Sequence, residues 1–180
     1  IELDDESYRL IPWTYPYPRG EVWSKAIENL SLAGAKVIVM DIMFDAPDQK
    51  SDLLNNYGQD LGFTPPVHGD EIFAHMIRDV QKMGTDVVLA SKVATEPTRV
   101  PPQYHLLPNL RIMDANPLTG LINVVEDKDG FMRRYFVFLP LAHEKDKRYP
   151  TIAMKAVQSY RNIPDDILPI VDIKGQKIKY

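Results

Sequence analysis

Apolar side chains recur along this chain with helical spacing in three segments. Over residues 21–33 they fall every three or four positions, and Gly34 follows as a C-terminal stop. The same period predicts a helix over residues 70–83, with Asp70 as its N-terminal cap. It also predicts a helix over 150–160, where a proline stands at the first turn.

Shorter apolar runs predict strands between these helices. Lys36–Asp41 and Asp86–Ser91 are nearly continuous and rich in Val, Ile and Leu, which is typical of strands buried on both faces of a parallel sheet. Ile1–Asp4 is predicted to be the end of an earlier strand, so that strand, helix and strand would form one right-handed βαβ unit. The predicted connections are 46–69, with a short helix at 51–57, and 95–117.

Alternating segments predict antiparallel pairs towards the C-terminus. Gly120–Glu126 and Phe131–Leu139 flank the turn-forming residues Asp127–Gly130, and Ile170–Tyr180 has the pattern of a small terminal hairpin. The predicted fold class is therefore α/β. We expect one domain over residues 1–180, with a mostly parallel central sheet, helices on both faces as in a Rossmann-like three-layer arrangement, and an antiparallel hairpin.

Composition narrows the kind of protein. The chain has 180 residues, of which 44% are hydrophobic and 26% charged, as in an ordinary folded domain. Its net charge of −4 lacks the basic surface that phosphate binding needs, so we expect no nucleic-acid partner. There is no cysteine, which excludes disulfides, thiolate metal sites and cysteine nucleophiles. No run approaches the roughly 18 apolar residues of a membrane span, and both ends read as strands, so we expect a piece of a longer protein.

Familiar catalytic motifs are missing. The chain contains no phosphate-binding glycine loop and no G-x-S-x-G nucleophile elbow. Its four histidines are scattered and none has a metal-ligand spacing, which predicts no metal site at histidines. Asp127–Gly130 has the beginning of a calcium loop, but Phe136 stands where such a loop needs a Glu, so a plain turn is favoured. We therefore predict no catalytic residue and no cofactor.

One acidic set carries possible chemistry. Asp4 and Asp5 would follow the first predicted strand and Asp41 the second, and ligands bind beyond the carboxyl ends of parallel strands. These carboxylates could bind a polar ligand or a hard cation, and a metal-dependent hydrolase built on them is an alternative function. The other interpretation is that each Asp only caps a following helix or turn.

An aromatic and cationic set lies in the proline-bearing segment before the first helix. Trp13, Tyr15, Tyr17 and Arg19 could form a rigid pocket wall, or a lid that packs over the sheet edge. Arg19 could also pair with Asp5 or Asp41, which would hold these charges for the fold rather than for a ligand.

Six motifs in order resemble the second class of CHASE domains, the cyclase- and histidine-kinase-associated sensory extracellular domains. They are Leu3-Asp4-Asp5-Glu6-Ser7; Tyr15-Pro16-Tyr17-Pro18-Arg19; Gly34-Ala35-Lys36-Val37-Ile38 with Asp41, Phe44, Pro47 and Asp48; Val87-Val88-Leu89-Ala90; Gly120, Asn123, Asp127, Asp129, Gly130 and Arg133; and Tyr149-Pro150-Thr151. The chain departs from the family pattern in a longer segment at 49–69 and in lacking the family's closing strand.

The resemblance implies an extracytoplasmic sensory domain, held to a bacterial inner membrane by flanking helices. It implies binding of an unidentified small molecule or ion, and output through a histidine kinase, nucleotide cyclase or Ser/Thr kinase. A structural or homodimerisation domain is a further alternative. The predicted ligand-binding residues are Asp4, Asp5, Tyr17, Arg19, Asp41, Asp129 and Arg133.

Overall fold

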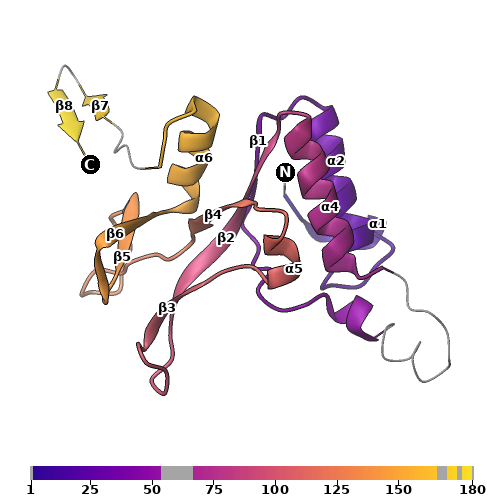
Figure 1. The fold of residues 1–180 in the computed structure, drawn as a ribbon, viewed down its shortest axis with the longest axis horizontal. Helices are drawn as coiled ribbons and strands as arrows, with labels where there is room; N and C mark the ends of the chain where they lie inside the picture. Colours follow the sequence, from indigo (N-terminus) through magenta and orange to yellow (C-terminus); the bar gives the residue numbers. More distant parts are fainter. Residues whose placement is uncertain (1, 54–66, 166–169, 174–175, 180) are drawn as a thin grey trace.

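The computed structural model describes residues 2–53, 67–165, 170–173 and 176–179 (Figure 1). Its centre is a parallel sheet in which β2 (Asp86–Thr95) lies between β1 (Val37–Met40) and β4 (Leu118–Leu121). The two buried strands predicted from apolar runs are thus confirmed. Val87 to Ala90 are completely buried, which explains why no polar residue interrupts this part of β2.

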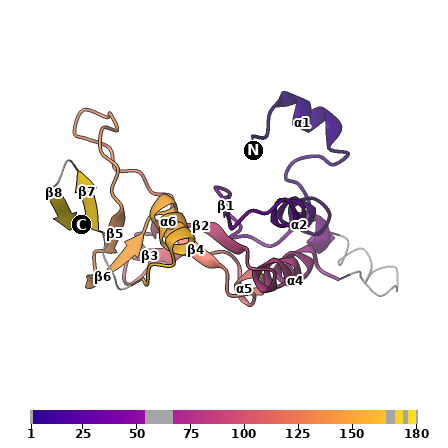
Figure 2. The same ribbon diagram turned by 90° about the horizontal axis from the view of Figure 1, so that it is seen from above.

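Helices cover both faces of this sheet, as predicted. The helix α2 (Ser24–Leu32), preceded by the π-helical turn η1 (Arg19–Trp23), lies beside α4 (Gly69–Lys82) on one face, and α6 (Ile152–Arg161) lies on the other (Figures 1 and 2). The main core lies under α2 and α4. Its fully buried members include Ile27, Phe73, Ile77, Val87 and Leu89.

Beyond the parallel sheet, β2 continues as an antiparallel ribbon. Its residues Lys92 to Thr95 pair with β3 (Gln103–Leu106), so part of the long connection predicted at 95–117 is a strand. The same connection carries the short helix α5 (Leu110–Met113). The tail forms an antiparallel pair, β7 (Ile170–Ile173) and β8 (Gln176–Lys179), which confirms the predicted terminal hairpin.

The hairpin predicted around Asp127–Gly130 is wrong in its strands. The turn exists, since Asp127 N donates to Phe131 O at 2.9 Å, but the strand before it ends at Leu121. The antiparallel partner of β5 (Phe138–Leu141) is β6 (Glu144–Pro150). Apolar residues on both sides of the turn, such as Val124 and Phe131, are exposed, so a paired ribbon here would have buried no apolar face.

The strand predicted at Ile1–Asp4 is also wrong within the described residues, because the chain there enters a helix. α1 (Asp5–Leu10) begins at the N-cap Asp4, whose carboxylate accepts from Ser7 N at 2.9 Å while Ser7 Oγ accepts from Asp4 N. This reciprocal capping box outweighs the short apolar signal before it. In the described part of the chain, β1 and β2 are parallel and α4 lies between them in the sequence. Of the helix predicted at 51–57, residues 51–53 are helical, as are 49 and 50 before them, and residues 54–57 lie outside the described residues.

Candidate functional site

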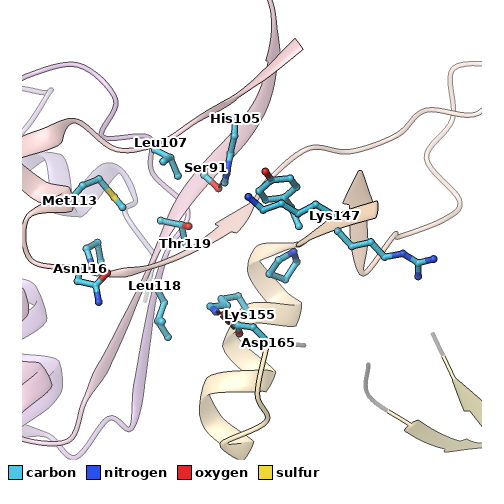
Figure 3. A pocket seen from close by; sticks show the side chains of 14 residues that line it. Ser91, His105, Leu107, Met113, Asn116, Leu118, Thr119, Lys147, Lys155 and Asp165 are labelled. Carbon is cyan, nitrogen blue, oxygen red and sulfur yellow. Dashed lines mark hydrogen bonds and ion pairs between the residues drawn. The ribbon is translucent and has the colours of Figure 1, made fainter. Parts of the chain in front are cut away.

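A cavity of about 460 Å³ lies between the sheet and the elements that follow it, α6 and β6 (Figure 3). We call it the His105 cavity. Its volume is in the range of small-molecule sites. Its walls are formed by Ser91, His105, Leu107, Met113, Asn116, Pro117, Leu118, Thr119, Lys147, Arg148, Tyr149, Pro150, Lys155 and Asp165.

One wall is a chain of polar and aromatic contacts. Ser91, the last β2 residue paired with β4, is completely buried, and its Oγ lies 2.8 Å from His105 Nε2 on β3. The His105 ring meets the edge of the Tyr149 ring, with 4.8 Å between their centroids. Tyr149 Oη in turn donates to Glu144 at 2.5 Å. Figure 3 shows Ser91 and His105 pointing toward one another at the upper end of the cavity.

Cationic groups reach the cavity from β6 and α6. Lys147 Nζ lies 4.7 Å from the Tyr149 ring centroid and 3.8 Å from the nearer Glu144 oxygen. The buried Lys155 ammonium donates to both Asp165 oxygens at 2.6 Å. Burial, and next the positive charge of Lys147, lower the pKa of His105 below its ordinary value. A neutral His105 ring therefore prevails near neutral pH.

The Ser91–His105 pair does not form a nucleophile, base and acid arrangement. Ser91 is shielded from solvent, and within the described residues no carboxylate is hydrogen-bonded to Nδ1 of His105. Hydrolytic triads need an accessible hydroxyl and an orienting third group. Among the described residues, the Ser91–His105 pair therefore lacks the accessible hydroxyl and the orienting carboxylate of a hydrolytic triad.

A second hollow, of about 340 Å³, adjoins the first across Leu118, Lys155 and Asp165. Gln158 of α6 lines it and is almost completely buried. Neither amide atom of Gln158 has a hydrogen-bond partner among the described residues. Because buried polar groups are nearly always paired, this amide marks the α6 side of the sheet as incompletely satisfied.

Close backbone contact fixes α6 against β4. A Cβ on Gly120 would lie 2.4 Å from Ile152 Cα, which explains the glycine in the family-like motif. Leu121 and Thr151 then form a parallel bridge, and Ser159 Oγ donates to Asp86 at 2.6 Å near the far end of the helix. These contacts position the cavity wall that α6 supplies.

The predicted residues Tyr17 and Arg19 lie elsewhere, on the α4 side. Arg19 is buried and its guanidinium bonds to Asp70 and, at 2.7 Å, to Ala46 O. Its backbone N donates to Asp48 Oδ2 at 2.7 Å, and Asp48 N donates to Asp70 Oδ2 at 3.1 Å. The expected pairing of Arg19 with Asp5 or Asp41 is therefore wrong, because Asp70 on the first turn of α4 takes the guanidinium instead.

The start of α4 completes this cluster. His68, not Asp70, is the N-cap, and its Nδ1 accepts from Asp70 N at 3.2 Å while Nε2 lies 3.0 Å from Asp52 Oδ1. A Cβ on Gly69 would lie 2.4 Å from Asp48 Oδ2, so the backbone must approach the carboxylate closely here. The whole arrangement joins η1, the loop after β1 and α4 through buried charges.

Tyr17 joins an aromatic row that runs into the core. Its ring contacts Tyr8, Tyr15 and Trp23, with centroids 5.8–6.1 Å apart, and the row continues to Phe44. Burial raises the pKa of Tyr17, whose hydroxyl has no partner among the described residues. Of the predicted aromatic set, Tyr17 is thus buried against the core, whereas Trp13 and Tyr15 remain exposed.

The predicted acids do not converge. Asp4 caps α1, and the hydrogen bonds from Ser7 lower the pKa of its carboxyl. Asp5 is exposed on the first turn of α1, and Asp41 is exposed directly after β1. Among the described residues, no group of three or more acidic or histidine side chains could hold a metal ion. The hydrolase alternative therefore loses the juxtaposition on which it depended.

The remaining predicted pair does come together. Arg133 bonds to Asp129 at 2.7 Å and to Asp127 at 3.4 Å, and Arg134 also bonds to Asp127. All of these side chains belong to the exposed turn after β4, and they line a shallow surface hollow. A ligand role for Asp4, Asp5, Tyr17, Arg19, Asp41, Asp129 and Arg133 stays a prediction.

The His105 cavity was not predicted from the sequence. His105 had no spacing that marked it, and Ser91 looked like the end of a buried strand. Tyr149 did belong to a motif, and so did Gly120, which lets α6 approach the sheet. These two motif residues, Gly120 on β4 and Tyr149 on β6, were the available signal.

Fold and cavity together define a mixed α/β domain with a small-molecule-sized cavity between its sheet and one helix. A family model described as the CHASE2 domain matches residues 1–179, so the chain belongs to the CHASE2 domain family. These domains are extracytoplasmic sensory modules of membrane receptors, and the resemblance drawn from the six motifs is confirmed.

Neither a curated protein nor a solved structure gave a significant match. No helix in the described parts of the chain combines the length and apolar character of a membrane span.

Proposed function

We propose that this chain binds a small-molecule signal in the His105 cavity and passes it to the output part of its receptor, a histidine kinase, nucleotide cyclase or Ser/Thr kinase. The observation that carries the proposal is a small-molecule-sized cavity in a domain that the CHASE2 family model matches over residues 1–179. Membrane attachment through flanking helices and association as a homodimer are parts of the same proposal.

The position of the cavity supports signalling. Its walls come from two groups of elements, the sheet strands on one side and α6 with β6 on the other. A ligand that contacts both groups favours one arrangement of α6 relative to the sheet. A receptor responds only when its ligand binds one of two arrangements better than the other. A cavity at such a junction meets that requirement.

The location can be tested with a single introduced thiol. The chain contains no cysteine, and Lys128 is exposed in the turn after β4. We expect the full-length receptor carrying Lys128→Cys to react with a membrane-impermeant maleimide in intact spheroplasts, with the unsubstituted receptor as the control. Labelling that needs lysis would contradict an extracytoplasmic domain.

The signalling role can be tested by filling the cavity. Thr119 lines the cavity, whereas Thr98 is exposed in the turn between β2 and β3. We expect full-length receptor with Thr119→Trp to differ from wild type in kinase or cyclase output, and Thr98→Trp to match wild type. A melting curve of the Thr119→Trp chain shows whether a changed output comes from filling the cavity or from unfolding of the domain. Equal output from all three folded receptors would overturn the proposal.

A further inference from the structure

The charges around the His105 cavity favour an anionic guest. Lys147 and Lys155 contribute positive charge at its walls, and Asp165, together with Glu144 beside Lys147, contributes negative charge. Asp165 is already paired with Lys155, whose ammonium donates a hydrogen bond to each of its carboxylate oxygens. The Lys147 ammonium forms a weaker ion pair, because its nearest carboxylate oxygen, on Glu144, lies 3.8 Å away. This ammonium remains able to take a shorter, charge-assisted hydrogen bond.

A hydroxyl group accompanies this charge. The Thr119 side chain lines the same space, whereas Ser91 Oγ and His105 Nε2 are bonded to each other. The lowered pKa of His105 has burial and the Lys147 charge as its main causes. An anion beside Lys147 would offset that positive charge, as the Glu144 carboxylate already does in part, and would therefore raise the pKa of His105.

Much of the remaining lining is apolar. Leu107, Met113 and Leu118 lie across the cavity from Lys147 (Figure 3), and Pro117 and Pro150 also line it. A fully hydrated anion such as inorganic phosphate would leave these walls unused and would need several donors for its three or four oxygens. A guest with one charged head group and an apolar body matches both sides of the cavity.

We infer that the His105 cavity binds a small organic carboxylate, with its head group on Lys147 near Ser91 and His105 and its apolar body against Met113 and Leu118. This inference rests on the proposed function, because it names the ligand class of the same cavity. It assigns the chemical class of the ligand, a carboxylate head group on an apolar body, and does not assign its complete structure.

Met113 provides a reporter inside the cavity. We propose ¹³C-methyl methionine NMR on the 180-residue chain, with Met113 assigned by Met113→Leu and the exposed Met83 as the remote reporter. The probes are hexanoate, hexanamide and hexylamine, which share an apolar body and differ in the head group. Hexanoate is expected to shift the Met113 methyl and to leave Met83 unmoved, whereas hexanamide and hexylamine have little effect.

A matched lysine separates the specific contact from general charge. Lys147 and Lys25 are each paired with a Glu three residues away, and their side chains are 65% and 66% exposed. Lys147→Met is expected to weaken hexanoate binding about tenfold or more, the loss that a charge-assisted hydrogen bond predicts. Lys25→Met is expected to keep wild-type affinity.

The outcomes are distinguishable from failure of the proposed function. A Met113 shift with hexanamide or hexylamine equal to that with hexanoate overturns the carboxylate inference and leaves the cavity as a ligand site. Hexanoate binding that survives Lys147→Met also overturns it. If none of the three probes shifts Met113 at millimolar concentration, the inference fails, while the output of the Thr119→Trp receptor still decides whether the cavity signals.

Discussion

Arg19 offers a sharp test of what the buried charges near α4 do. In Arg19→Met the apolar stem is largely kept, while the guanidinium that bonds to Asp70 and to Ala46 O is removed. Asp70 is completely buried and Asp48 nearly so. Asp70 would then lie in the protein interior without its cationic partner, whereas Asp48 keeps its bond from the backbone N of residue 19.

The expected loss follows from leaving a buried charge unpaired. Breaking such a pair by removing one partner costs about 3–5 kcal/mol. The total stability of a domain is about 5–15 kcal/mol, so the variant would lose a large part of it. For a chain of this size each kcal/mol lowers the melting temperature by roughly 2–4 °C, which gives a decrease of about 6–20 °C.

The assay is urea unfolding with a parallel thermal melt. Arg133→Met is the matched control, because Arg133 pairs with Asp129 at the surface, with both side chains more than half exposed. Exposed pairs contribute about 0–1 kcal/mol. The double variant Arg19→Met/Asp70→Leu is expected to lose less than the two single losses added together, since no unpaired charge remains at residue 70. A loss for Arg19→Met as small as that for Arg133→Met would refute the reasoning.

Three further outcomes are expected. Gly120→Ala places a methyl group 2.4 Å from Ile152 Cα. It should lower the free energy of unfolding measured in urea by about 1–3 kcal/mol or more. An unchanged unfolding midpoint would show that α6 can shift to make room. Gln158→Met removes a buried amide that lacks a partner among the described residues and should raise that free energy by about 1–3 kcal/mol; a loss would reveal a partner. Because the folded-state pKa of His105 is lowered, the unfolded chain binds its proton first, from about pH 6.5 downward. The free energy of unfolding should therefore be highest above that pH and should fall as the pH drops through the folded-state pKa. His105→Phe should reduce the slope of unfolding free energy against pH, measured by urea titrations at several pH values. An equal slope in both chains would exclude His105 as the cause.

The pattern of apolar residues was sufficient to predict those helices and strands whose own residues have a clear period or a continuous apolar run. The runs at 36–41 and 86–91 became β1 and β2, and helical spacing located α2, α4 and α6 to within a few residues. The pattern failed at Asp4, where the capping box between Asp4 and Ser7 decided the conformation against a short apolar run. It also failed after β4, where apolar residues such as Val124 are exposed and form no ribbon.

The sites required contacts between distant parts of the chain. Arg19 meets Asp70 across 51 positions, and no spacing in the sequence indicates that partnership. The predicted partners of Arg19, Asp5 and Asp41, were instead chosen at expected strand ends, and residues 2–4 of the first expected strand are not in a strand. His105 lies near Ser91 because β2 and β3 are paired, and near Tyr149 because β6 comes back beside them. The cavity therefore could not be predicted from the sequence without knowing how the antiparallel strands are paired.

The two faces of the sheet differ in how well their polar groups are satisfied. On the α4 face the buried groups Arg19, Asp48, His68 and Asp70 bond to one another or to backbone, and the Tyr17 hydroxyl is the exception among the described side chains. On the α6 face both amide atoms of Gln158 lack partners there, and two adjoining hollows flank the Lys155–Asp165 pair. A fully bonded ionic cluster resists rearrangement, whereas unpaired groups and empty volume lower the cost of one. A ligand-driven change in this domain should therefore move α6 and β6 against a sheet that α2 and α4 hold in place.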